Sequence, residues 1–128
     1  MAIDVKKLLS KLLVKADVPK QLNATTVKPS STGWERTYKT VPEMADYNMI
    51  GVRFQICSTA DNYIDQLLIF YRQIGNWTQS MAWNNGSTYV RGLVTVNWDT
   101  NQVGVALING DINNAFCRIS QVVGLSHK

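Results

Sequence analysis

Side chains that could carry catalysis are sparse in this 128-residue sequence. The single histidine, His127, stands beside the C-terminal lysine, and the two cysteines, Cys57 and Cys117, lie inside strand-like apolar runs. A catalytic nucleophile needs a base within hydrogen-bond reach, and this histidine has no serine or cysteine with which it would credibly pair. We therefore expect no catalytic residues and predict that the chain is not an enzyme.

Cofactor and metal motifs are also missing from the sequence. It contains neither GxxxxGK[ST] nor GxGxxG, the glycine patterns that cradle phosphates and dinucleotides, and its cysteine and histidine spacing matches no metal site. Two facing carboxylates could hydrolyse a glycosidic bond, but the acids fall mostly at turns. We predict no cofactor and no metal, and two reduced, half-buried thiols; a disulfide between two strands is the alternative.

Aromatic residues followed directly by amides and carboxylates are more informative. The chain has four tryptophans and five tyrosines. Apolar faces of sugar rings stack on aromatic side chains, while amides and carboxylates bond to sugar hydroxyls. We therefore predict a saccharide site, and the candidate residues are, first, Trp83, Asn84, Asn85 and Tyr89 and, second, Trp98 with Asp99. The alternative, that these rings fill the core of a small domain, stays open.

A basic amphipathic helix is predicted at the N-terminus, within residues 1–20. Apolar residues recur there at three- and four-residue steps and so share one face: Val5, Leu8, Leu9, Leu12, Leu13 and Ala16. A helix of about thirteen residues is marginal alone in water, so this face needs a partner. We predict that it drives oligomerisation, with packing onto the chain's own body as the alternative.

The rest of the chain has the texture of a β protein. Residues 21–33 lack any period and are rich in Ser, Thr and Pro, which predicts a linker or an extended arm. After it, short β-type runs alternate with turn residues, and the expected strands are 47–57, 66–73, 77–83, 89–98, 102–108 and 115–123. Such spacing without intervening helices indicates a sandwich or barrel. We predict a mainly β fold, an antiparallel jelly-roll-like β-sandwich over residues 34–128, preceded by the short helix.

The net charge of +4 lies in the N-terminal segment. Residues 1–33 carry six lysines against two aspartates, whereas residues 34–128 carry five arginines and two lysines against seven acids. Binding of single-stranded nucleic acid needs a positively charged groove, so we predict no nucleic-acid partner. No stretch approaches the roughly eighteen apolar residues of a membrane span, and no small-residue cleavage site follows the first leucines. We expect neither membrane insertion nor a signal peptide.

The C-terminal third carries a family resemblance. After Trp83 come an Asn-Asn-Gly turn, a strand at 91–96, a short turn and a second strand at 102–107. The chain then closes on Phe116–Leu125, of the type aromatic-x-Arg-Ile-x-x-Val-x-Gly. This stretch resembles the C-terminal head domain of tail-fibre and receptor-binding proteins of bacteriophages and prophages.

The resemblance implies a jelly-roll or related β-sandwich head that is commonly trimeric and binds saccharides on the host cell surface. A leading apolar helix face would be buried in such a trimer. The implied partners are two further copies of the chain, a cell-surface saccharide and other virion or tail proteins. The implied location is the virion tail, or the bacterial cytoplasm before assembly. Two alternatives stay open: a structural or assembly protein of the virion that binds no sugar, and a bacterial lectin-like carbohydrate-binding module.

Overall fold

The computed structural model describes residues 4–6, 18–59, 61–84 and 86–128. The predicted N-terminal helix therefore lies largely outside the described residues. Of its apolar face only Val5 is described, and its side chain is exposed; Leu8, Leu9, Leu12, Leu13 and Ala16 lie outside. The oligomerisation expected from that face stays a prediction.

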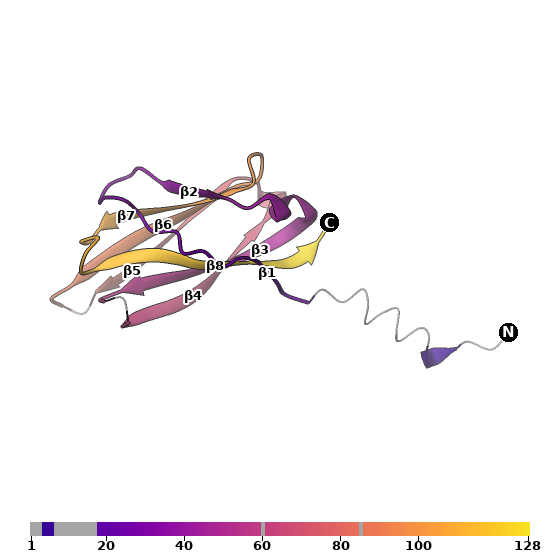
Figure 1. The fold of residues 1–128 in the computed structure, drawn as a ribbon, viewed down its shortest axis with the longest axis horizontal. Helices are drawn as coiled ribbons and strands as arrows, with labels where there is room; N and C mark the ends of the chain where they lie inside the picture. The colour runs from indigo at the N-terminus through magenta and orange to yellow at the C-terminus, as the bar shows by residue number, and fades with distance from the viewer. Residues whose placement is uncertain (1–3, 7–17, 60, 85) are drawn as a thin grey trace.

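In the part of the chain that the structure describes, eight antiparallel strands form two four-stranded sheets (Figure 1). The first sheet has the order β1 (Lys20–Asn23), β8 (Phe116–His127), β3 (Tyr47–Cys57) and β4 (Tyr63–Tyr71). The second has the order β2 (Thr37–Thr40), β7 (Gln102–Asn109), β6 (Tyr89–Asn97) and β5 (Trp77–Asn84). Two short 3-10 helices, η1 (Pro42–Asp46) and η2 (Arg72–Ile74), precede β3 and follow β4. The predicted mainly β, antiparallel architecture is confirmed.

The core lies between the two sheets and follows from the alternation of apolar residues. In β3, Val52, Phe54 and Ile56 are buried while Arg53 between them is exposed, because successive side chains of a strand point to opposite faces. The facing strand β6 leaves room for the Phe54 ring at Gly92. A Cβ atom on Gly92 would lie 2.6 Å from Phe54 Cζ, so only glycine lets the two sheets approach this closely.

Strand bounds differ from the prediction mainly in the first sheet. The bounds of β3 are as predicted, but β4 begins at Tyr63 and not at Gln66, and β8 continues to His127. The extension of β8 arises because it pairs on both sides, with β1 through Lys20↔Gly124 and with β3 through Tyr47↔His127. Partners on other strands, which the local pattern does not contain, set these bounds.

Residues 21–33, expected to be a linker or an extended arm, are an arm held against both sheets. Part of β1 lies in this segment, and Val27 exchanges two backbone hydrogen bonds of 2.9 Å with Ile119 of β8. Further on, Gly33 donates a 2.8 Å hydrogen bond to the Leu107 carbonyl of β7. The sandwich therefore begins at Lys20, ahead of the predicted boundary at Trp34.

The two ends of the sandwich carry different features (Figure 1). The C-terminus and η1 lie at one end, which we call the C-terminal end. The loops that join β3 to β4 and β5 to β6 lie at the other, which we call the loop end. The predicted Trp83 cluster belongs to the loop end, since it surrounds the connection of β5 and β6.

Candidate binding site

The first predicted aromatic cluster is divided between the two faces of the second sheet. Trp83 pairs with the fully buried Val90, so its side chain points inward, where it packs against the core. Tyr89 pairs with Asn84 and points outward with 45% of its surface exposed. Asn84 Oδ1 accepts a 2.8 Å hydrogen bond from the Gly86 N–H within the turn, and Asn85 lies outside the described residues. Trp83 and Tyr89 share an end of the sheet but face opposite ways.

Trp83 nevertheless borders a small opening between the sheets. This hollow measures about 70 Å³ and is lined by Ile56, Ser58, Asn62, Tyr63, Ile64 and Trp83. Its volume is little more than two water molecules occupy in the liquid. It is too small to hold a sugar ring without movement of the side chains around it.

The second predicted pair, Trp98 with Asp99, contributes to the core and to a turn. Trp98 is 6% exposed and belongs to the core. Asn76 accepts a 2.8 Å hydrogen bond from the Trp98 N–H and donates a 3.1 Å one to the Asp99 carboxylate. Asn97 Oδ1 accepts from the N–H groups of Asp99 and Thr100. The polar residues around Trp98 therefore stabilise a turn, and the ring offers no open face to a ligand.

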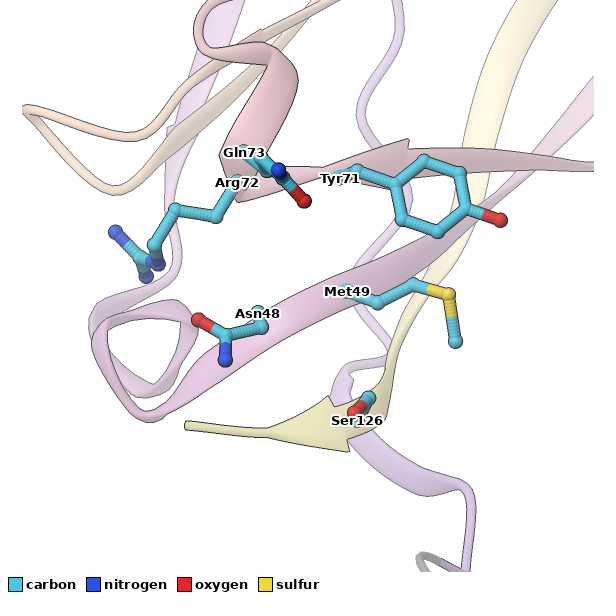
Figure 2. A pocket seen from close by; sticks show the side chains of 6 residues that line it. All are labelled: Asn48, Met49, Tyr71, Arg72, Gln73 and Ser126. Atoms are coloured by element: carbon cyan, nitrogen blue, oxygen red, sulfur yellow. The ribbon is translucent and has the colours of Figure 1, made fainter.

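A larger hollow lies at the C-terminal end, where sequence reasoning placed no site (Figure 2). Its volume is about 340 Å³, which is within the range of small-molecule sites. It is lined by Asn48, Met49, Tyr71, Arg72, Gln73 and Ser126. We call it the Tyr71 hollow.

Three neighbouring strands position these residues. Met49 of β3 pairs with Tyr71 of β4 on one side and with Ser126 of β8 on the other. The three residues therefore form one row across the outer face of the first sheet. Asn48 precedes this row in β3, and η2 turns the chain after β4 so that Gln73 stands over the hollow (Figure 2).

The Tyr71 hollow is rich in hydrogen-bonding groups, and its lining residues other than Arg72 are uncharged. Tyr71 is 47% exposed, and Figure 2 shows its ring beside the Met49 side chain, with Asn48 across the hollow. Within the described part of the chain, no hydrogen bond engages the side chains of Asn48, Gln73 or Ser126. Two amides and a hydroxyl thus remain available next to an open aromatic surface.

Arg72 supplies a wall of the hollow, and its guanidinium is committed to the protein. It donates hydrogen bonds of 2.9 Å to the Tyr47 carbonyl and 2.8 Å to the Met44 carbonyl, and it lies 4.5 Å from the centre of the Trp98 ring. In Figure 2 the guanidinium accordingly points away from Tyr71. Arg72 therefore joins η1, β3 and the β6–β7 corner, and it fixes the start of η2 where Gln73 stands.

The cysteines and the histidine, the side chains that could act as nucleophiles or metal ligands, do not line this hollow. Cys57 and Cys117 are free and buried; burial raises the pKa of both thiols, that of Cys117 to about 12, so neither is a ready nucleophile. The His127 ring stacks on Tyr47 with 4.3 Å between ring centres. Among the described residues no group of three potential ligands could hold a metal ion. The same residues contain no helix long and apolar enough to cross a membrane.

Sequence reasoning could not find the Tyr71 hollow because its parts are far apart in the chain. Asn48, Tyr71 and Ser126 meet only through strand register, and none stands in a local pattern of an aromatic followed by amides. The nearest local indication of a site is Tyr71-Arg72-Gln73, which the sequence assigns to the predicted strand 66–73.

No protein family, curated protein or solved structure matches this chain.

Proposed function

We propose that this chain is a non-catalytic binding domain of a phage or prophage tail, and that it recognises a saccharide of the host cell surface in the Tyr71 hollow. The observation that carries the proposal is the open Tyr71 ring beside two unengaged amides and a hydroxyl. A pyranose presents an apolar face to an aromatic ring and hydroxyls to amides at its rim. The tail context rests on the resemblance of the stretch after Trp83 to tail-fibre heads.

The neutral lining also favours a sugar over a charged ligand. Of the six described residues that line the hollow, Arg72 alone is charged, and its donors bind the Tyr47 and Met44 carbonyls. Among the residues that line the hollow, an anion would find no cation directed toward it, and a cation would find no carboxylate. A neutral polyhydroxylated ligand requires neither.

A glycan array followed by titration calorimetry tests the proposal. We expect saturable binding to a surface glycan, and Tyr71→Ala should weaken it roughly 5- to 150-fold, because stacking of a ring on an aromatic side chain contributes on the order of 1–3 kcal/mol. The control is Tyr38→Ala, which removes an equally exposed tyrosine, 47%, from the outer face of the second sheet.

Two results would contradict this placement. Loss of binding in Tyr89→Ala with intact binding in Tyr71→Ala would move the site to the loop end, where the sequence placed it. Absence of binding to any glycan or host cell, with the protein folded, would favour the structural role in the virion.

A further inference from the structure

The edge strand β4, like the β5 edge of the second sheet, lacks the protection that β1 and β2 have, and it carries more of the large exposed apolar side chains. Proteins shield free edges with short strands, lysine, proline or bulges, because an open edge pairs with other chains. The edge strands β1 and β2 have four residues each and carry Lys20 and Lys39. By contrast, β4 has nine residues, pairs with β3 without a register shift and forms the free border of the first sheet (Figure 1). Its single charge, Asp65, forms an ion pair with Arg53.

The hydrogen-bonding groups at alternate residues of β4 point away from the sheet. The Arg53 carbonyl accepts a hydrogen bond from the Ser120 hydroxyl of β8, so the backbone N–H and C=O of Arg53 point toward β8. Leu67 lies opposite Arg53 in the antiparallel pair of β3 and β4, and its backbone N–H and C=O therefore point away from β3, toward the free edge. Two residues along, the Ile69 carbonyl accepts a 2.6 Å hydrogen bond from Gln79 of the second sheet. Within the described residues this is the single bond at the outer side of β4, and a carbonyl has a second lone pair.

The sequence of β4 has Leu67 at its centre. It reads Tyr-Ile-Asp-Gln-Leu-Leu-Ile-Phe-Tyr, with a tyrosine at each end. We propose that β4 pairs with β4 of a second copy of this chain, antiparallel and about a twofold axis at Leu67. This register sets Tyr63 against Tyr71 of the second copy and Leu67 against Leu67, and it uses the outward-directed groups at these positions. Isologous contacts of this kind close as dimers.

The side chains at this edge fit such a contact. Tyr63, Ile64 and Leu67 are large apolar residues that each remain 43–45% exposed, and pairing covers the part of their surface that faces the edge on both copies. The Asp65 side chains of the two copies lie about 15 Å apart at the strand rise of roughly 3.4 Å per residue. This exceeds the Debye length of about 8 Å at physiological ionic strength, so repulsion between them is small.

The contact is modest in size and therefore concentration-dependent. A covered aromatic side chain buries roughly 150–250 Å² in full, so the partly exposed side chains of two copies contribute on the order of 600 Å². Stable complexes bury about 1,200 Å² or more. We expect a dissociation constant between roughly 1 μM and 1 mM, and a monomer–dimer equilibrium.

The test is sedimentation of the full chain across this concentration range. Leu67→Lys should weaken dimerisation at least tenfold, because it places two ammonium groups against each other on the axis. The control Ala82→Lys adds the same charge to an exposed position of β5, the edge strand of the second sheet, and should leave the equilibrium unchanged. Circular dichroism of each variant verifies its fold.

A cysteine pair gives a second measurement that does not depend on destabilising the contact. Residues opposed in a hydrogen-bonded antiparallel pair have Cα atoms about 5.5 Å apart, which a disulfide can span. Leu67→Cys in oxidised glutathione should therefore give a covalent dimer, and Ala82→Cys should not. The native thiols of Cys57 and Cys117 are buried and should form no disulfide between copies.

Three results would overturn the proposal. The first is a monomer at every concentration, and the second is a dimer that Leu67→Lys leaves unchanged. The third is a trimer that persists in Leu67→Lys but is lost in a Leu9→Asp/Leu12→Asp variant. This last result would instead support oligomerisation through the N-terminal helix.

Discussion

Replacing Arg72 with methionine should destabilise the C-terminal end of the sandwich more than any comparable change at the surface. Methionine retains most of the aliphatic stem and removes the guanidinium, which bonds to the Tyr47 and Met44 carbonyls and stacks on Trp98. Each hydrogen bond from a charged donor is worth roughly 1.5–3 kcal/mol. Because Arg72 is half-buried, water can reach part of the freed carbonyl groups, and we expect a loss of about 3 kcal/mol.

Arg91 provides the matched control, because it is another half-buried arginine of the same protein. It makes one 3.2 Å hydrogen bond to the Ser80 hydroxyl and lies 5.9 Å from the centre of the Trp34 ring. We expect Arg91→Met to cost less than about 1 kcal/mol.

Urea denaturation followed by tryptophan fluorescence measures both variants. With a slope of about 1.5 kcal/mol/M, Arg72→Met should lower the midpoint by roughly 2 M, and Arg91→Met by less than about 0.7 M. Equal shifts in the two variants would refute the assignment of Arg72 as the residue that joins this end of the sandwich.

Two further predictions concern the core. Gly92→Ala should destabilise the fold by about 1–3 kcal/mol through overpacking, since the new Cβ lies 2.6 Å from Phe54 Cζ and 2.7 Å from Cys117 Sγ. In thermal denaturation, adding Phe54→Leu should recover part of this loss. A double variant whose loss is the sum of the two single losses would count against overpacking as the cause. Burial raises the pKa of Cys117 from 9.0 to about 12, so the folded state keeps a proton that the unfolded chain releases. The unfolding free energy should therefore be unaffected by this thiol below pH 9 and fall as pH rises from 9 toward 12, by up to about 1.4 kcal/mol per pH unit. Urea midpoints at pH 8 and pH 10.5 should show a smaller decline in Cys117→Ala, and an unchanged decline would show that other groups cause it.

Local alternation predicted six of the eight strands in the described residues, β1 and β2 being missed, but it did not predict their partners. The run from Tyr47 to Cys57 alternates clearly, and the structure has a strand with those bounds. The pairing of Val27 with Ile119 joins segments more than ninety residues apart, and no apolar period within residues 21–33 predicts it. Register and sheet order depend on such contacts, which explains why residues 21–33 looked unstructured.

The fate of the tryptophans shows a similar limit for the binding site. Both Trp83 and Trp98 precede polar turn residues, the pattern that predicted exposure. A strand end can direct its last side chain to either face, and for Trp83 the parity is set by its pairing with Val90. The Asp99 carboxylate accepts a hydrogen bond from Asn76, and the Asp99 N–H donates one to Asn97 in the turn. Amides at a turn are therefore as consistent with turn formation as with ligand binding.

The proposed dimer and the proposed site bear on each other through geometry. In the β4 pair about Leu67, the outer faces of both first sheets lie on the same side, because a twofold axis normal to the sheet preserves its faces. Tyr71 lies four residues from the axis, so the two Tyr71 residues stand about 27 Å apart along the strands. If both proposals hold, a dimer presents two hollows on one surface. Two weak sites that bind the same repeating surface polysaccharide give a higher overall affinity than either site alone. The dimer would therefore bind a cell surface even though each hollow binds its sugar weakly.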